Sequence, residues 1–229
     1  MKASLITSLL LVMTTTSAHA MVIINEVLGS TTGADSEFIE LYNTSASAIS
    51  IGGWSVELWD SDSGGAFGNA DGDSPYVIDA GAMIEGFGFY TLANGLAESL
   101  FAFAADQSLP SNAIENSSYT IILADAANTA LNSIFVTDGD AGDTANRAGT
   151  SITPDFAFGP DGTFLPAGFF REFDGADTLL LQSFSDFTDT GTPGATNDPS
   201  VEPPLPSVPL PASLLLMMTG LWVMVARRR

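Results

Sequence analysis

Residues 37–43 read EFIELYN, and this stretch decides the fold class. Apolar and polar side chains alternate along it: Glu40 and Tyr42 fall on one face, and the residues beside them fall on the other. A period of two is typical of a β-strand. We expect Glu40 to point outward from a half-exposed sheet, and we interpret Glu26 and Glu37 in the same way.

Strand-like segments flank this stretch on both sides. Residues 21–28 (MVIINEVL) form a β-branched run, and residues 48–59 (AISIGGWSVELW) form a longer one. The longer run is interrupted at Gly52 and Gly53, where a bulge or a tight bend is expected. Trp54 shares a face with two aliphatic residues of this run and is predicted to lie in the core, because its ring buries a large area.

The rest of the region repeats this pattern of short apolar runs separated by turn residues. Further strands are predicted at residues 76–79, 83–93, 118–124, 131–137 and 178–184. A short helix is predicted at residues 96–105, with Leu96, Leu100 and Phe103 on one face. Residues 138–177 form a long segment without a clear strand or helix pattern, and some regular structure is expected within it because so long a loop is unusual in a compact domain. About seven to eight short strands predict an all-β fold, a β-sandwich.

Several of these segments also resemble the motifs of one known family. They are Ile24–Val27 (INEV), Glu37–Asn43 (EFIELYN), Ile51–Val56 (IGGWSV) and Thr192–Asn197 (TPGATN), with Arg171 and Asp174-Gly175 ahead of the last. In this order they resemble the opening and closing motifs of a lamin tail domain. The resemblance implies an immunoglobulin-like sandwich, which we assign to residues 21–198. The chain departs from the family pattern by being longer, chiefly at 60–75 and 138–177.

The N-terminal end has the pattern of a secretion signal. Lys2 supplies a positive charge, an apolar stretch follows, and Ala18 and Ala20 form the small-x-small pattern that precedes a cleavage site. We expect signal peptidase to cut after Ala20, so that residues 1–20 are a signal peptide. The alternative is a first transmembrane helix, but the stretch is too short to cross about 30 Å of hydrocarbon.

Three features follow one another at the C-terminal end. Residues 199–207 belong to a proline-rich linker, and residues 208–229 contain an apolar stretch long enough for a single transmembrane sorting helix. This tail begins with VPLPA and ends with a basic cluster, which the positive-inside rule places in the cytoplasm. The residues concerned are Val208, Pro209, Leu210, Pro211, Ala212, Arg227, Arg228 and Arg229.

The tail resembles the PEP-CTERM group of sorting signals in its VPLPA variant, with Leu210 where the commoner form has Glu. The resemblance implies that an exosortase, a membrane-embedded cysteine protease, cuts near the proline motif. It also implies a Gram-negative bacterium, in which the protein is anchored transiently in the inner membrane and then reaches the cell surface or the extracellular matrix. The alternative is a permanent tail anchor.

The region between the two ends is strongly acidic and poor in catalytic side chains. The chain has 27 Asp and Glu against 6 Lys and Arg, a net charge of −21, and Arg147 and Arg171 are the basic residues away from the ends. Such a field repels nucleic acid, so nucleic-acid binding is excluded. There is no cysteine, and the single histidine, His19, lies in the predicted signal peptide. A Ser-His-Asp triad, a Cys nucleophile and a His/Cys zinc site are therefore excluded.

Two acidic loops are candidate calcium sites. The first carries Asp60, Asp62, Asp71 and Asp73, and the second (DGDAGD) carries Asp138, Asp140 and Asp143. Aspartates spaced by glycine allow several oxygens to converge on a hard cation. DGDAGD is the better candidate, and the alternative for both is a solvated acidic loop.

We therefore expect a non-enzymatic surface or matrix protein in an exopolysaccharide or biofilm setting, with an exopolysaccharide or another surface protein as its partner. Signal peptidase and exosortase are its expected processing enzymes, and calcium is the one cofactor considered. The first alternative is a calcium-dependent adhesin or polysaccharide-binding module. The second is a hydrolase that uses a pair of carboxylates.

Overall fold

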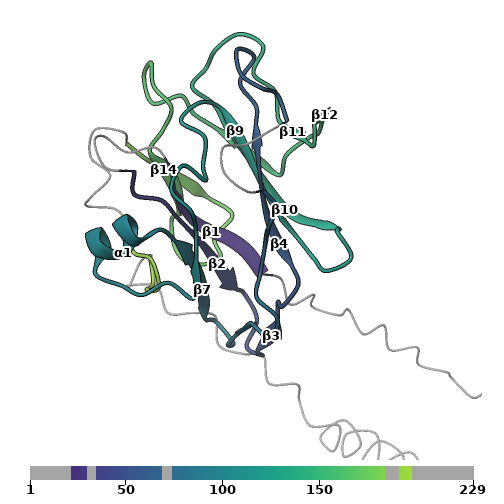
Figure 1. Ribbon diagram of the computed structural model, residues 1–229. Helices are drawn as coiled ribbons and strands as arrows, with labels where there is room; N and C mark the ends of the chain where they lie inside the picture. The colour runs from purple at the N-terminus through teal and green to yellow at the C-terminus, as the bar shows by residue number, and fades with distance from the viewer. Residues whose placement is uncertain (1–21, 30–34, 69–73, 184–190, 198–229) are drawn as a thin grey trace, which may run out of the picture.

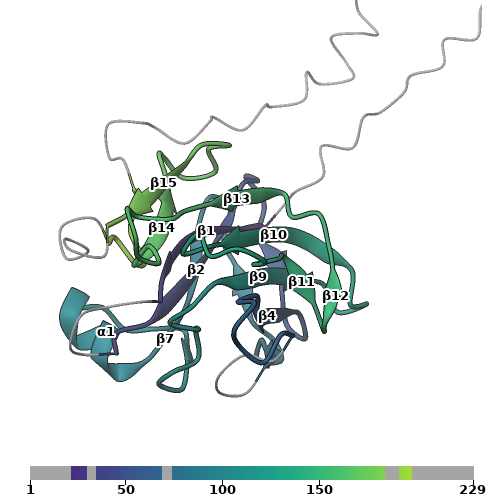
Figure 2. The same ribbon diagram turned by 90° about the horizontal axis from the view of Figure 1, so that it is seen from above.

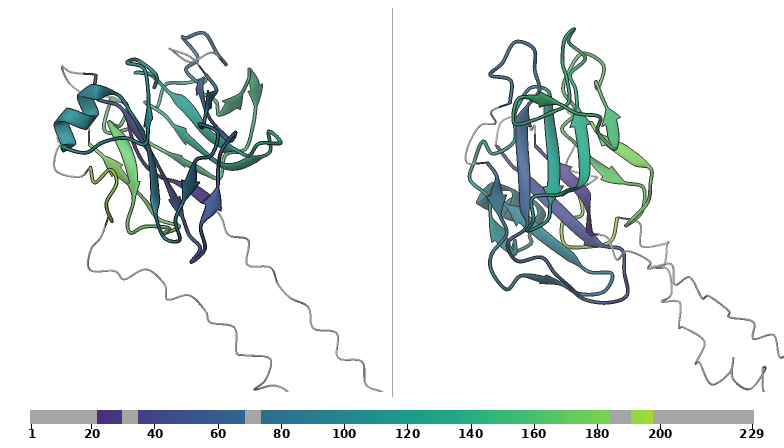
Figure 3. Two further views of the ribbon diagram at one scale, coloured as in Figure 1. Left: turned by 60° about the horizontal axis from the view of Figure 1, so that its bottom comes forward. Right: turned by 90° about the vertical axis from the view of Figure 1, so that its right-hand side faces the viewer.

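Figure 1 shows the computed structural model of the chain, in which two β-sheets pack face to face. The structure describes residues 22–29, 35–68, 74–183 and 191–197. The larger sheet has the strand order β15-β14-β1-β2-β7-β8, and the smaller has the order β13-β10-β9-β4-β5. Figure 3 (right) looks onto the smaller sheet, with the strands of the larger sheet crossing behind it. The predicted all-β sandwich is confirmed at this level.

The strands of the larger sheet are β1 (Val22–Leu28), β2 (Phe38–Asn43), β7 (Phe89–Ala93), β8 (Gln107–Ser108), β14 (Gly168–Arg171) and β15 (Leu179–Gln182). Those of the smaller are β4 (Ser55–Asp60), β5 (Tyr76–Val77), β9 (Tyr119–Ala124), β10 (Ala130–Val136) and β13 (Phe156–Phe158). Two short pairs are added by β3 (Ile49–Ser50) with β6 (Met83–Ile84) and by β11 (Asn146–Arg147) with β12 (Thr150–Ser151).

The first strand lies near the centre of the larger sheet. β1 pairs antiparallel with β2 on one side and with β14 on the other, although β14 lies about 140 residues further along the chain. β15 then pairs with β14 and forms the edge of the sheet, as Figure 2 shows. Both ends of the domain thus meet in one sheet.

The core lies between the two sheets. Alternate residues of β1 and β2, among them Ile24, Ile39 and Leu41, are fully buried there against aliphatic side chains of β4, β9 and β10. β-branched and leucine side chains at every second position fit this pleated, buried surface. Trp54 is half-buried and packs at the margin of this cluster, so its predicted place in the core is confirmed only in part.

The outer face of the larger sheet is covered by helix α1 (Gly95–Phe101), which Figure 1 shows on the side away from the smaller sheet. Asn94 caps the helix by accepting a hydrogen bond from the Ala97 N–H at 2.9 Å. The expected apolar face was wrong: Leu96 and Leu100 are exposed, and the helix instead buries Ala97. Phe101 packs edge-on against Phe38 with ring centroids 5.4 Å apart.

Residues 138–177 hold more structure than the sequence indicated. They contain β11, β12, β13 and β14, and β14 is an inner strand of the larger sheet. The predicted strand at 83–93 is two strands, β6 and β7, with a turn between them. The run at 48–59 is likewise β3 and β4, separated at the expected Gly52-Gly53 turn.

Candidate functional site

Two glutamates lie opposite one another on the outer face of the larger sheet. The register between β1 and β2 shifts between Ile24 and Glu26, so that Asn25 forms a bulge and Glu26 faces Glu40. Both side chains are fully buried. The expectation that they point outward to solvent is therefore wrong, because the face that they occupy is covered.

The cover is the closing segment, residues 191–197 (GTPGATN), which runs beside α1 in Figure 1. The Thr192 N–H lies 3.2 Å from both carboxyl oxygens of Glu26, and the Gly194 N–H donates to Glu40 Oε2 at 2.6 Å. Gly194 has a φ of +77°, a conformation that glycine adopts without strain. The turn that begins at Thr192 therefore aims two backbone donors at the carboxyl pair.

Asn25 and Asp174 extend this contact. Asn25 Nδ2 donates to Glu40 Oε1 at 2.8 Å and to Asp174 Oδ1 at 3.0 Å. Asp174 Oδ1 also accepts the Asn197 N–H at 3.2 Å, and Asn197 Nδ2 donates to the Arg171 carbonyl at 2.8 Å. The opening and closing sequence motifs thus bind one another directly in the folded chain.

The Thr192 hydroxyl lies between two oxygens. Its Oγ1 is 3.3 Å from Glu26 Oε2 and 2.9 Å from Asn197 Oδ1. On the other side of the same carboxyl group, Gln182 Nε2 donates to Glu26 Oε1 at 2.8 Å. Among the described residues, the groups that form hydrogen bonds with the Glu26 carboxyl belong to Thr192 and Gln182, which are both uncharged.

Burial sets the protonation of this pair. It raises the pKa of Glu26 to about 8, although hydrogen bonds from Thr192 and Gln182 act in the opposite direction. Burial also raises the pKa of Glu40 well above its usual value, and the charge of Glu26 adds to the effect. One of the two groups can therefore hold a proton at neutral pH.

Arg171 is the buried cation nearest to this network. It is 2 % exposed, its Nε donates to the Ile24 carbonyl at 2.9 Å, and its other guanidinium contact is the Ala176 carbonyl. The guanidinium also lies 5.3 Å from the ring centre of Phe156. Burial lowers the pKa of Arg171 to about 10. Within the described residues it has no carboxylate at ion-pair distance, whereas Arg147 pairs with Glu57 at 2.5 Å.

Glu37 makes a second buried contact elsewhere on the sandwich. Its Oε1 accepts the Ile114 N–H at 2.8 Å, and its Oε2 accepts the Ala113 N–H at 3.1 Å. Burial raises the pKa of Glu37 to about 7 despite these bonds. This side chain is fully buried too, so its outward assignment was also wrong. Its position indicates that it holds the loop before β9 against β2.

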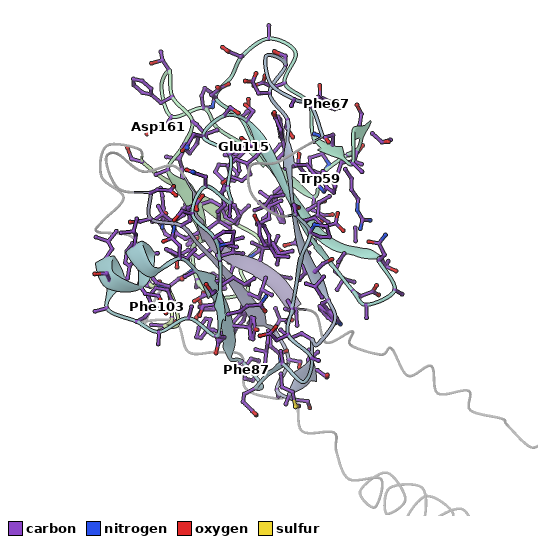
Figure 4. The ribbon with its side chains drawn as sticks, viewed as in Figure 1. Trp59, Phe67, Phe87, Phe103, Glu115 and Asp161 are labelled. Carbon is purple, nitrogen blue, oxygen red and sulfur yellow. The ribbon has the colours of Figure 1, made fainter. Side chains whose placement is uncertain are left out.

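The two acidic loops meet at one end of the sandwich. Ser63 Oγ donates to the Ala141 carbonyl at 3.2 Å, and the Thr144 N–H donates to the Ser61 carbonyl at 3.0 Å. Figure 4 places Phe67 of the first loop at this end. The sequence does not indicate that the two loops meet, because no local signal pairs residues about 80 positions apart.

Asp138 and Asp143 come together over one hydroxyl. Ser118 Oγ lies 3.2 Å from Asp138 Oδ1 and 2.6 Å from Asp143 Oδ2. Burial raises the pKa of Asp138. Burial also tends to raise the pKa of Asp143, but hydrogen bonds from Ser118, Ser63 and Thr137 outweigh this effect, so the pKa of Asp143 is lowered. Asp140 is exposed and binds the pair through its backbone N–H, 3.2 Å from Asp138 Oδ1.

The predicted calcium ligands are thus only partly gathered. Within the part of the chain that the structure describes, no three acidic or histidine side chains form a group that could hold a metal ion. In the first loop, the Asp62 N–H donates to Asp60 Oδ1 at 2.9 Å, whereas Asp71 and Asp73 lie outside the described residues.

The predicted processing residues lie outside the described residues as well. These are Ala18, Ala20, Val208, Pro209, Leu210, Pro211, Ala212, Arg227, Arg228 and Arg229. Across the described segments, no helix has the length and apolarity needed to cross a bilayer.

Two family models match the chain. One, described as Lamin Tail Domain, matches residues 15–138. The other, described as the PEP-CTERM protein-sorting motif, matches residues 207–229. No curated protein matches the chain.

Proposed function

Because this chain belongs to the lamin tail domain family and carries a PEP-CTERM sorting motif, we propose that it is a non-enzymatic surface or matrix module. The sorting motif indicates an exported protein that passes through the membrane on its way to the cell surface. Signal peptidase removes residues 1–20, and an exosortase cuts near Val208–Ala212. The mature domain, within residues 21–198, then serves in an exopolysaccharide or biofilm setting of a Gram-negative bacterium.

The observation that carries this proposal is the order of features at the C-terminal end. The sorting motif at residues 207–229 follows a proline-rich linker, which itself follows a folded domain. A semi-rigid proline spacer keeps the processing motif clear of that domain. The apolar stretch and the final arginines fit transient anchoring in the inner membrane before cleavage.

The roles of the motif residues support a non-enzymatic domain. Asn25, Glu26, Glu40, Thr192 and Asn197 are engaged with one another and hold the closing segment on the sheet. The Glu26–Glu40 pair is fully buried, whereas a glycosidase needs its carboxyl pair open to the sugar. These contacts stabilise the fold and disfavour a carboxylate hydrolase at this position.

Mass spectrometry of surface and secreted material tests the processing. We expect a mature chain that begins at Met21 and lacks residues 214–229. A variant with Pro209→Ala and Pro211→Ala should accumulate uncut in the inner membrane, whereas Pro203→Ala and Pro204→Ala in the linker should be processed normally. Recovery of the intact tail from the inner membrane alone, in the unmodified protein, would make it a permanent anchor.

A calcium-dependent adhesin or polysaccharide-binding module is the second candidate. The observation in its favour is that the two acidic loops meet, because the Ser63 N–H of the first loop donates to Asp143 Oδ1 of the second at 3.3 Å. Binding of purified exopolysaccharide with and without millimolar Ca²⁺ separates this function from a passive structural one. Equal binding with Mg²⁺ at the same concentration would contradict a calcium-specific role.

A further inference from the structure

One edge of the larger sheet is formed by an apolar strand. β15 (LLLQ) pairs with β14 on one side, and no other described strand pairs with its far side. Figure 2 shows it at the margin of the sheet. The strand contains no charged residue and no proline, and Leu180 and Leu181 are 38 % and 37 % exposed. Such an edge presents a row of unpaired N–H and C=O groups, which is a template for another strand.

The other edges of the two large sheets are protected against such pairing. β8, at the opposite edge of the larger sheet, has two residues and follows Asp106 directly. In the smaller sheet, β5 has two residues and follows Pro75, and β13 lies between Asp155 and Gly159-Pro160. Short strands, charges and prolines are the features by which proteins block an edge. Only β15 among these edges lacks them.

A hydrogen bond at the start of β15 shows which of its backbone groups face outward. The Glu172 N–H donates to the Thr178 carbonyl at 3.1 Å, so these two residues form a hydrogen-bonded pair of the antiparallel ladder. Hydrogen-bonded and non-hydrogen-bonded pairs alternate in such a ladder. The N–H and C=O groups of Leu180 therefore face β14, whereas those of Leu179 and Leu181 face the open edge.

The far side of β14 gives the same alternation. The Gly29 N–H donates to the Ala167 carbonyl at 2.8 Å, so this is a hydrogen-bonded pair between the first and the second-last segment of the sheet. Phe169, two residues further along, is likewise bonded to β1. Phe170 therefore turns its backbone groups toward β15, where its partner is Leu180.

We propose that two copies of this chain pair antiparallel along β15, about a two-fold axis that passes between their Leu180 residues. In this register, Leu179 of each copy lies opposite Leu181 of the second copy. These are two hydrogen-bonded pairs, and each exchanges both of its N–H···O bonds. The same edge serves on both copies, as a contact about a two-fold axis requires. The two larger sheets then form one continuous sheet.

The side chains of β15 fit a second copy rather than a charged partner. The two Leu180 side chains meet in a non-hydrogen-bonded pair, where opposite side chains are closest. Leu181 lies on the same face as Leu179, which packs against the core, so each Leu181 covers Leu179 of the second copy. Like charges directly opposite one another are destabilising. An uncharged edge avoids this cost, although the chain has a net charge of −21.

The contact is small, which sets its strength. Stable interfaces involve about 20–30 residues a side, and a four-residue strand supplies fewer. We therefore expect weak association in dilute solution and stronger association where copies are held close together. The proposed location on a cell surface would hold them so, but the pairing is a property of the edge and does not rest on that location.

The absence of cysteine from the chain allows a direct test by cross-linking. Leu180→Cys places two thiols across the axis, at a Cα separation that a disulfide can bridge. Mild oxidation of the purified full chain, in detergent and 1 M NaCl to screen repulsion between copies, should give a disulfide-linked dimer. Leu96→Cys is the matched control: this leucine is exposed on α1 and should remain largely monomeric. Equal cross-linking of both variants would assign the association to the tails and overturn the edge pairing.

Two variants that block the edge give a second test. Leu181→Pro removes an N–H that faces the open edge, and proline is tolerated at such a position. Leu180→Lys places like charges opposite one another but makes the chain less acidic, so association governed by net charge would strengthen. Analytical ultracentrifugation should show a dimer dissociation constant raised at least about tenfold by each variant. Circular dichroism checks the fold, and Leu180→Lys decides the matter if Leu181→Pro does not fold.

The opposite results are equally clear. An unchanged or lower dissociation constant for Leu180→Lys would overturn the proposal. So would a Leu180→Cys chain that stays monomeric on oxidation at millimolar concentration, because the edge would then be covered by another segment or by nothing.

Discussion

Replacement of Arg171 by methionine tests how two opposing effects balance at a buried cation. Arg171→Met keeps most of the apolar stem but leaves the Ile24 and Ala176 carbonyls without their donor. Each unsatisfied buried carbonyl costs about 1–3 kcal/mol, and the lost contact with the Phe156 ring adds about 1 kcal/mol. The loss in the free energy of unfolding from these contacts is therefore roughly 3–7 kcal/mol.

The opposing effect is the cost of burying the guanidinium. A pKa lowered from 12.5 to about 10 corresponds to about 3 kcal/mol against the buried cation, which the methionine variant does not incur. The net expected destabilisation for Arg171→Met is thus about 2 kcal/mol. Arg171→Ala should cost roughly 2–3 kcal/mol more, because it also leaves a cavity beside the ring of Phe156.

Urea unfolding at pH 7, followed by circular dichroism, measures both variants. The slope of free energy against urea concentration should stay unchanged, so that the midpoints report stability. A loss of more than about 5 kcal/mol for Arg171→Met would refute the expectation that the cost of burying the charge offsets part of the lost contacts, because the cation would then be strongly stabilising. Equal losses for methionine and alanine would show instead that packing around the stem contributes little.

Further predictions concern pH, metal and packing. The pKa of Glu26 is raised to about 8 and that of Glu37 to about 7, so their contribution to stability is complete below pH 4.5 and is lost as the pH rises through these values. Urea unfolding in 1 M NaCl, which screens surface repulsion, should show a loss of roughly 3 kcal/mol from Glu26 alone between pH 5 and 8. A free energy of unfolding that stays level or rises over this range would contradict the prediction. If the second candidate function holds, millimolar Ca²⁺ should raise the melting midpoint more than equal Mg²⁺ does, and Asp138→Asn with Asp143→Asn should abolish the difference. An equal rise with both ions would mean screening alone. Trp54→Ala should cost about 2–3 kcal/mol by urea unfolding, less than a fully buried tryptophan would, since its ring is only partly buried. A negligible loss would move the ring to a binding surface.

Local patterns predicted much of the fold. The strands at 21–28, 37–43, 118–124 and 131–137 were found within one or two residues, because each combines β-branched residues with turn residues at its ends. The structure of residues 138–177 was harder to predict from the sequence. Its inner strand, β14 (GFFR), is short and lacks alternation, and it is a strand because it pairs with β1 on one side and β15 on the other.

The candidate site was misread for a different reason. Alternation in EFIELYN correctly places Glu40 on the opposite face from the core, and a one-sided sheet would leave it in water. The closing segment covers that face from 154 residues away, as the bond from Gly194 to Glu40 shows. Helix α1 was mispredicted for the same reason. Leu96 and Leu100 have the spacing of a buried helix face, but both are exposed in the folded chain. Contacts of such separation have no local sequence signal.

The central position of β1 has a consequence for export. A chain that crosses the membrane from its N-terminus delivers β1 first, but one of the two neighbours of this strand, β14, emerges roughly 140 residues later. The larger sheet stays incomplete until residues 168–197 have also crossed. Contacts of long sequence separation form slowly, so the exposed edge of β1 is open to wrong pairing during that interval. The larger sheet can therefore be completed only late in export, after β14 has reached β1.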